Sequence, residues 1–144
     1  MNMRSLIAGA GLAALMIAGW AIFVREPAQI ATTQQEPGQA LVEVALPVNL
    51  TDKEQIGARA FDAKCADCHG ENAAGRDGMG PPLVHIIYEP NHHGDHAFHL
   101  AVMNGVRGHH WPFGNMPAVD GLTNGDVDTI VAYVRALQRA NGIN

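Results

Sequence analysis

The sequence predicts a small all-α domain with long loops, covering residues 51–144. Three observations predict this fold class. Helix-start signals precede apolar residues at helical spacing near both ends of the segment. The sequence between them is rich in glycine, proline and asparagine, and no part of it alternates apolar and polar residues as a strand does. Because so short a domain has a thin hydrophobic core, a large apolar group at its centre would help to stabilise it.

The first predicted helix begins at Thr51 and runs for about three to four turns into a cysteine motif. Thr51 and Glu54 have the spacing of a capping box, in which the hydroxyl accepts the amide hydrogen of the glutamate and the carboxylate reaches back. The apolar residues that follow at helical spacing are Ile56, Ala60 and Phe61.

Two further helices are predicted. A short one covers residues 96–104, with Asp95 as its N-cap and Gly105 as its stop. The last helix starts at a weaker capping signal, Thr123 to Asp126, and stops near Gly142. Its apolar stripe consists of Val127, Ile130, Val131, Val134 and Leu137. The polar residues that we expect to face water are Asp126, Asp128, Arg135 and Arg139.

The amino-terminal residues 1–25 are predicted to form a membrane anchor or a signal peptide. Residues 5–24 carry no charge, and a helix of about twenty residues spans the roughly 30 Å hydrocarbon core of a bilayer. A signal peptide usually has a shorter apolar region, so the length favours a retained anchor, although Gly19-Trp20-Ala21 resembles a cleavage site. In both cases Arg4 favours an amino terminus on the inside, and the rest of the chain is exported.

Residues 26–50 are predicted to be a tether between this segment and the domain. They contain three prolines, several glutamines and no sustained periodicity. The apolar stretch 40–48 could instead form a short strand or contact a partner.

The charge of the chain excludes one class of partner. The net charge is −5 and no basic run is present. Nucleic-acid binding requires clustered lysine and arginine side chains that neutralise phosphates. We therefore expect no nucleic-acid partner.

Cys65 and Cys68 are the two cysteines of the chain, and His69 follows directly. A redox disulfide of this spacing is expected near a βαβ pattern, which the sequence lacks. A zinc site needs four ligands, or three and a water, and no second ligand pair follows at finger-like spacing. In a Cys-x-x-Cys-His motif both thiols can reach the vinyl groups of one porphyrin while the imidazole reaches its iron. Export of the chain agrees with this third interpretation, covalent haem attachment.

Met116 is the predicted second axial ligand of the iron. It precedes Pro117 in a loop, so packing on a helix stripe does not account for it, and a thioether ligand stabilises reduced iron. The competing candidates are Met79, Met103 and the histidines at positions 92, 93, 96, 99, 109 and 110.

From about residue 51 to its end, the chain resembles a small class I cytochrome c. The motif from Cys65 to His69 matches the haem attachment site, and Met116-Pro117 matches the distal loop. Gly80-Pro81-Pro82-Leu83 resembles the Gly-Pro-x-Leu motif of the family. Three further residues look like those at which the first and last helices of the family cross: Gly57, Phe61 and Tyr133.

The resemblance implies three to four helices around one covalently bound haem c. It implies that Cys65 and Cys68 form the thioether bonds, and that His69 and Met116 are the proximal and distal iron ligands. It also implies that the carbonyl of Pro81 accepts a hydrogen bond from the proximal imidazole.

The segment from residue 89 to 116 departs from the simplest family pattern because it contains six histidines. The first interpretation is a solvated loop whose histidines cap backbone groups. The second is a surface metal site, for which imidazole and thioether ligands favour copper. The third is a docking face for a partner, with Trp111 and Phe113 as exposed anchors.

With both axial positions filled, the iron has no open position for a substrate. The sequence therefore predicts an electron carrier and not an enzyme, passing single electrons between redox proteins outside the cytoplasm. These partners include an oxidase, a reductase, another cytochrome or a copper enzyme, and the chain could be the electron-entry subunit of a larger complex. The expected location is the periplasmic face of a bacterial inner membrane, or the periplasm if residues 1–25 are cleaved. The alternatives are a haem-based gas or redox sensor and a copper-handling protein that uses the histidine-rich segment.

Overall fold

The computed structural model describes residues 36–144, and the predicted membrane segment lies outside this range. Its helices are α2 (Asp52–Lys64), α3 (Ala66–His69), α4 (Asp95–Asn104) and α5 (Asn124–Ala140), with 3₁₀ turns η1 (Glu71–Ala73) and η2 (Ile86–Tyr88). The described residues form two isolated β-bridges and no strand. The predicted all-α class is confirmed. No helix within residues 36–144 is long and apolar enough to cross a membrane.

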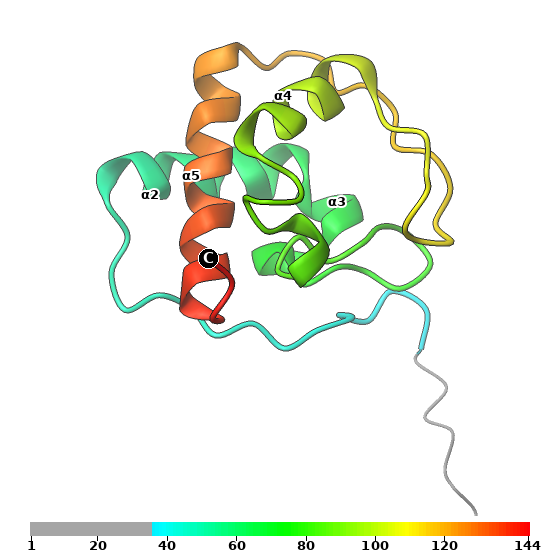
Figure 1. Cartoon of the computed structure of the whole chain (residues 1–144), viewed down its shortest axis with the longest axis horizontal. Helices are drawn as coiled ribbons and strands as arrows, with labels where there is room; N and C mark the ends of the chain where they lie inside the picture. The colour runs from blue at the N-terminus through cyan, green and yellow to red at the C-terminus, as the bar shows by residue number, and fades with distance from the viewer. Residues whose placement is uncertain (1–35) are drawn as a thin grey trace, which may run out of the picture. The chain divides into compact units, whose positions relative to one another are not determined.

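Helices α2 and α5 cross one another (Figure 1), and Gly57 lies at their contact. A Cβ atom added to Gly57 would lie 1.9 Å from the carbonyl oxygen of Thr129, so only glycine allows the two backbones to come this close. One turn further along α2, the ring of Phe61 packs against Tyr133 with 5.8 Å between centroids. The hydroxyl of Tyr133 donates a hydrogen bond to Asn72 Oδ1 (3.0 Å), which ties the crossing to the loop after the cysteine motif.

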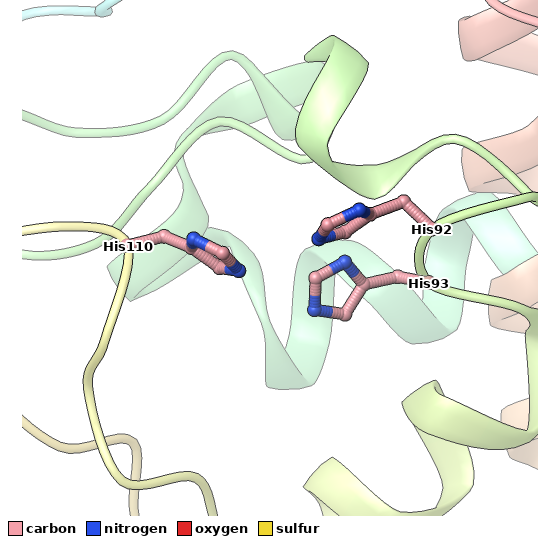
Figure 2. Close-up of side chains that lie close together, drawn as sticks. All are labelled: His92, His93 and His110. Atoms are coloured by element: carbon pink, nitrogen blue, oxygen red, sulfur yellow. The ribbon is translucent and has the colours of Figure 1, made fainter.

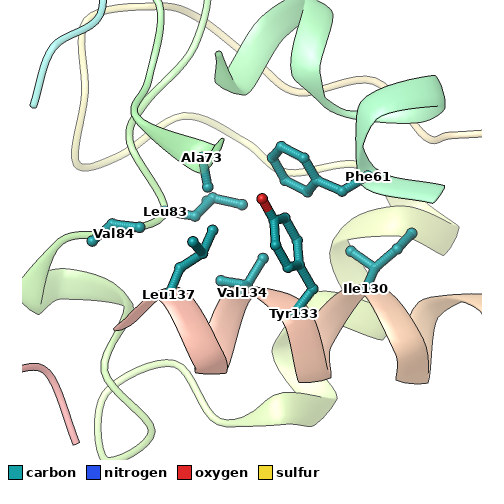
Figure 3. Close-up of a cluster of buried hydrophobic side chains, with 8 residues drawn as sticks. All are labelled: Phe61, Ala73, Leu83, Val84, Ile130, Tyr133, Val134 and Leu137. Atoms are coloured by element: carbon teal, nitrogen blue, oxygen red, sulfur yellow. The ribbon is translucent and has the colours of Figure 1, made fainter. Parts of the chain in front are cut away.

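The main hydrophobic core lies against one face of α5 (Figure 3). Four of its residues come from α5, Phe61 comes from α2, and the remainder come from η1 and the loop before η2. The predicted apolar stripe of the last helix is confirmed, because all five of its residues are buried. The core residues are Phe61, Ala73, Leu83, Val84, Ile130, Tyr133, Val134 and Leu137.

The helix starts agree with the sequence in two cases out of three. Complete capping boxes precede α2, at Thr51 and Glu54, and α5, at Thr123 and Asp126. The prediction that Asp95 caps the short helix was wrong, because Gly94 is the N-cap and Asp95 is the first helical residue. The carboxylate of Asp95 accepts a hydrogen bond from the side chain of Arg135 on α5.

Arg135 is buried, with 8 % of its surface exposed, and the prediction that it faces water was wrong. Its Nε donates to Asp95 Oδ1 (2.8 Å), and its Nη1 donates to the carbonyl of Tyr88 and to Gln138 Oε1, both at 2.6 Å. Its Nη2 donates to the carbonyl of His93 (2.6 Å). These hydrogen bonds satisfy the guanidinium group, because burying its charge without partners would cost a large free energy. The residue therefore attaches the 88–95 segment to α5.

Residues 36–50 contact the helical domain. The amide of Leu41 donates to the carbonyl of Ala74 (3.1 Å), and the amide of Ala45 donates to Asn141 Oδ1 (2.9 Å). The second half of the predicted tether therefore packs on the domain, and it contains no strand.

Replacing Gly57 by alanine should destabilise the protein. The added methyl group would push α5 away from α2, because it meets a backbone oxygen that cannot rotate aside. Overpacking of this kind costs about 1–3 kcal/mol or more. The measurement is the free energy of unfolding of the holoprotein in guanidinium chloride. The matched control is Gly125→Ala, where the new Cβ meets only Thr123 Oγ1 at 3.7 Å and the free energy should change by less than about 1 kcal/mol. Equal effects of the two variants would contradict the close crossing.

Replacing Arg135 by methionine should lower the free energy of unfolding by about 2–3 kcal/mol, because two backbone carbonyls and a buried amide oxygen lose their charged donor. The control is Arg139→Met, which removes an arginine side chain that is 55 % exposed and paired with Glu54. Exposed pairs contribute about 0–1 kcal/mol. A loss at position 139 as large as that at 135 would refute the role of the buried network.

Candidate functional site

An apolar cavity of about 280 Å³ lies between α2, α4, α5 and the loops that follow α3 and α4. This is nearly twice the roughly 150 Å³ of an engineered cavity that holds benzene. The side chains of its apolar wall include Phe61, Leu83, Phe98, Val102, Val127 and Ile130. Such a space at the centre of a small domain indicates a site for a large apolar ligand.

The two cysteines lie at one side of this cavity, where α2 ends and α3 begins. The two cysteines do not form a disulfide with each other. Burial, and to a smaller extent the neighbouring Cys68, raise the pKa of the Cys65 thiol to about 11. A thiol with a raised pKa is a weak nucleophile near neutral pH, which disfavours Cys65 as the attacking group of a redox disulfide. Neither cysteine belongs to a cluster of three potential metal ligands within residues 36–144.

His69 ends α3 and lines the same cavity. Its Nδ1 lies 2.9 Å from the carbonyl oxygen of Pro81. Because a carbonyl only accepts, Nδ1 carries the proton and Nε2 keeps a free lone pair. Burial lowers the pKa of His69, and the hydrogen bond to Pro81 opposes this effect. The result is a neutral, oriented imidazole, which is the form that binds a metal.

The Gly-Pro-Pro-Leu segment is pressed against the cysteine motif. A Cβ atom on Gly80 would lie 2.6 Å from the carbonyl oxygen of Cys68, so this glycine allows Pro81 to approach His69. The following Pro82 is fully buried. Tight packing on both sides therefore holds the carbonyl that orients the imidazole.

Met116 lies on another segment of the cavity wall. Its backbone exchanges two hydrogen bonds of 2.9 Å with Val106, which hold the loop together. The other two methionines of residues 36–144 are largely exposed, Met79 at 49 % and Met103 at 62 %, and neither lines the cavity. Of the histidines that compete with Met116 as the second axial ligand, His93, His109 and His110 line the cavity, whereas His92, His96 and His99 do not. The ligand roles of His69 and Met116 remain predictions.

Trp111 and Phe113 form part of the wall and are half-buried, so neither is as exposed as the docking interpretation of the sequence expected. Their rings are stacked, with 6.0 Å between centroids. The indole Nε1 of Trp111 is buried and has no well-formed hydrogen bond. Burial raises the pKa of the nearby Tyr88, and the indole opposes this effect. Neither aromatic residue was predicted to line the wall, because nothing in a loop sequence shows which way its side chains point.

These residues fit a haem. The cavity is large and apolar, as a porphyrin ring requires, and a paired thiol motif, a neutral imidazole and a thioether line it. A haem that is attached through two cysteine thioethers can also have its iron bound by a histidine and a methionine. The buried Trp111 Nε1, which makes no well-formed hydrogen bond, is a donor that would be available to an acidic substituent of the ring.

The all-α fold and the lining of the cavity are together those of a haem-binding domain. The protein-family model described as "Cytochrome c" matches residues 54–138, which is more than half of the chain. The chain belongs to the cytochrome c family, and its domain binds covalently attached haem c and carries electrons instead of acting as an enzyme. A comparison with curated proteins found no match.

Proposed function

We propose that this cytochrome transfers single electrons between redox proteins outside the cytoplasm, with the haem iron held between His69 and Met116. Cys65 and Cys68 form the thioether bonds to the ring. One observation carries the proposal: these four side chains line a single apolar cavity, although Met116 comes from a different loop.

The haem supplies an iron that alternates between the ferric and ferrous states. The protein determines how easily the iron changes between these two states. His69 is oriented by Pro81 (2.9 Å), so the imidazole needs little rearrangement when the charge on the iron changes. The thioether of Met116 favours the ferrous state, and the apolar wall raises the potential further because it disfavours the extra charge of the ferric state.

The partners are other redox proteins, because two filled axial positions leave no place for a substrate. An oxidase, a reductase, another cytochrome or a copper enzyme meets this requirement. The acidic net charge of −5 favours a partner with a positively charged docking surface.

We also propose that residues 1–25 direct export and hold the domain at the periplasmic face of the membrane, with residues 26–50 as the connection to the domain that starts at residue 51. The uncharged run 5–24 and the preceding Arg4 support this proposal.

Loss of Met116 should change the spectrum and the potential. In Met116→Ala the weak sulfur-to-iron absorption band of the oxidised protein should disappear, and the reduction potential should fall, because the iron loses its soft ligand. The measurements are oxidised and reduced absorption spectra with a potentiometric titration. The matched control is Met103→Ala, which removes an exposed methionine and should change neither property.

The outcome that refutes Met116 as ligand is a sulfur-to-iron band that survives the substitution. A low-spin wild-type spectrum without the band would favour a histidine of the cavity wall. A high-spin iron that binds carbon monoxide readily would favour a gas sensor.

Export can be tested on a chain that lacks residues 1–25. The full chain should carry covalent haem in the membrane fraction, whereas the truncated chain should stay in the cytoplasm without haem. The measurement is haem staining of denaturing gels of cell fractions. An unrelated signal peptide fused to the truncated chain should restore haem attachment. Covalent haem on the truncated cytoplasmic chain would contradict the proposal.

A further inference from the structure

Three histidines from two separate loops converge beside the haem cavity. His92 and His93 precede α4, and His110 follows it. One potential ligand atom from each side chain lies within 4.8 Å of the others. Figure 2 shows the three rings turned toward one another across the gap between the loops. The first interpretation of the sequence, a solvated loop whose histidines cap backbone groups, agrees with the hydrogen bonds of His93 and His109 to backbone carbonyls but gives no reason for this convergence.

The central ring of the cluster is oriented by the protein. Nδ1 of His93 donates to the carbonyl of Ile87 (2.7 Å), which leaves Nε2 with the free lone pair. The backbone carbonyl of His93 in turn accepts a hydrogen bond from the buried Arg135 (2.6 Å). A ligating histidine almost always donates its other ring nitrogen to a carbonyl or carboxylate in this manner.

A fourth imidazole lies next to the three. The ring of His109 is 4.1 Å from that of His110 and 6.3 Å from that of His93, measured between centroids. Its Nδ1 also donates to a carbonyl, that of Arg107, at 2.8 Å. The cluster is therefore a concentration of imidazole nitrogens, and its three converging members include no carboxylate or thiolate.

We propose that His92, His93 and His110 bind a divalent late transition-metal ion, with Cu²⁺ bound more tightly than Zn²⁺. Imidazole ligands suit copper, nickel and zinc and do not suit magnesium or calcium, and copper has the highest affinity in the divalent series. Nitrogen atoms bound at about 2.0–2.1 Å to one ion lie about 2.9 Å apart at adjacent corners of a square plane, the arrangement that Cu²⁺ prefers, and about 3.4 Å apart in the tetrahedron of Zn²⁺. His92 and His110 are exposed, so no surrounding core fixes their rings at the present spacing of up to 4.8 Å.

The ion would lie at the edge of the haem cavity, because His93 and His110 line the cavity as well. A cation at this position stabilises the ferrous state, which carries one positive charge fewer than the ferric state. Metal binding and reduction are then linked: a metal that raises the reduction potential binds more tightly to the reduced protein by the corresponding factor. The metal site goes beyond electron transfer and does not depend on the ligand role of Met116.

Titration of the oxidised holoprotein with copper sulfate tests the site. One Cu²⁺ per chain should bind, with electron paramagnetic resonance showing nitrogen ligands. His92→Ala/His110→Ala should weaken binding on the order of a hundredfold or more. The matched control is His96→Ala, which removes an exposed histidine outside the cluster and should leave the affinity unchanged. Unchanged copper affinity in the double variant, or an equal loss in His96→Ala, would overturn the proposal.

The haem spectrum of the double variant shows whether copper binding is lost through unfolding or through a change at the iron. The spectrum should match that of the unmodified protein, because the proposed metal ligands do not bind iron and their removal leaves the fold intact. A change in the spin state or the axial-ligand bands would mean that a cluster histidine serves the haem, and would overturn the assignment.

Zn²⁺ tests the position of the site beside the haem, because it has no redox chemistry of its own. Saturating zinc should raise the reduction potential of the holoprotein, and the double variant should not respond. A potential that does not move at saturating zinc would refute the placement of the ion at the cavity edge.

Discussion

The close approach of α2 and α5 at Gly57 organises the whole domain. A Cβ atom there would lie 1.9 Å from the Thr129 carbonyl oxygen, so the helices pack backbone to backbone. This contact brings Phe61 against Tyr133 and directs the carboxyl end of α2, with Cys65, toward the cavity. A wider crossing would separate the cysteine motif from the wall that α5 provides.

The second organising interaction is polar. Arg135 and Gln138 on α5 are buried, and between them they donate hydrogen bonds to the carbonyls of Leu83, Tyr88 and His93. These bonds satisfy backbone groups in a segment with little regular structure, where helix or sheet partners are absent. The same bonds set the position of the histidine cluster, since the His93 carbonyl is one of the acceptors. A charged side chain on a largely apolar helix thus links the core to the segment that carries the proposed metal ligands.

The cavity is built from a packed side and a loop side. On the packed side, Gly80 and Pro82 hold the Pro81 carbonyl against His69. On the loop side, Met116 is held mainly by its two backbone hydrogen bonds to Val106. A bound haem would therefore contribute much of the apolar contact between the two sides, in agreement with the thin core of a domain of this size. We therefore expect substitutions of residues that contact the edge of the haem to disturb the loop side of the cavity more than the packed side.

Local spacing and short motifs were enough to predict the positions of α2, α4 and α5, two capping boxes, the apolar stripe of α5 and the family. They could not predict the burial of Arg135, the inward position of Trp111 or the meeting of His92, His93 and His110, which depend on the folded chain. Residue spacing alone predicts that a charged side chain on a helix faces water. Arg135 is instead surrounded by backbone carbonyls of Tyr88 and His93, which are distant in the sequence and belong to a segment without periodicity. The whole of α4 separates His92 and His93 from His110 in the sequence. Their convergence therefore depends on how the two loops fold and not on any pattern in the chain.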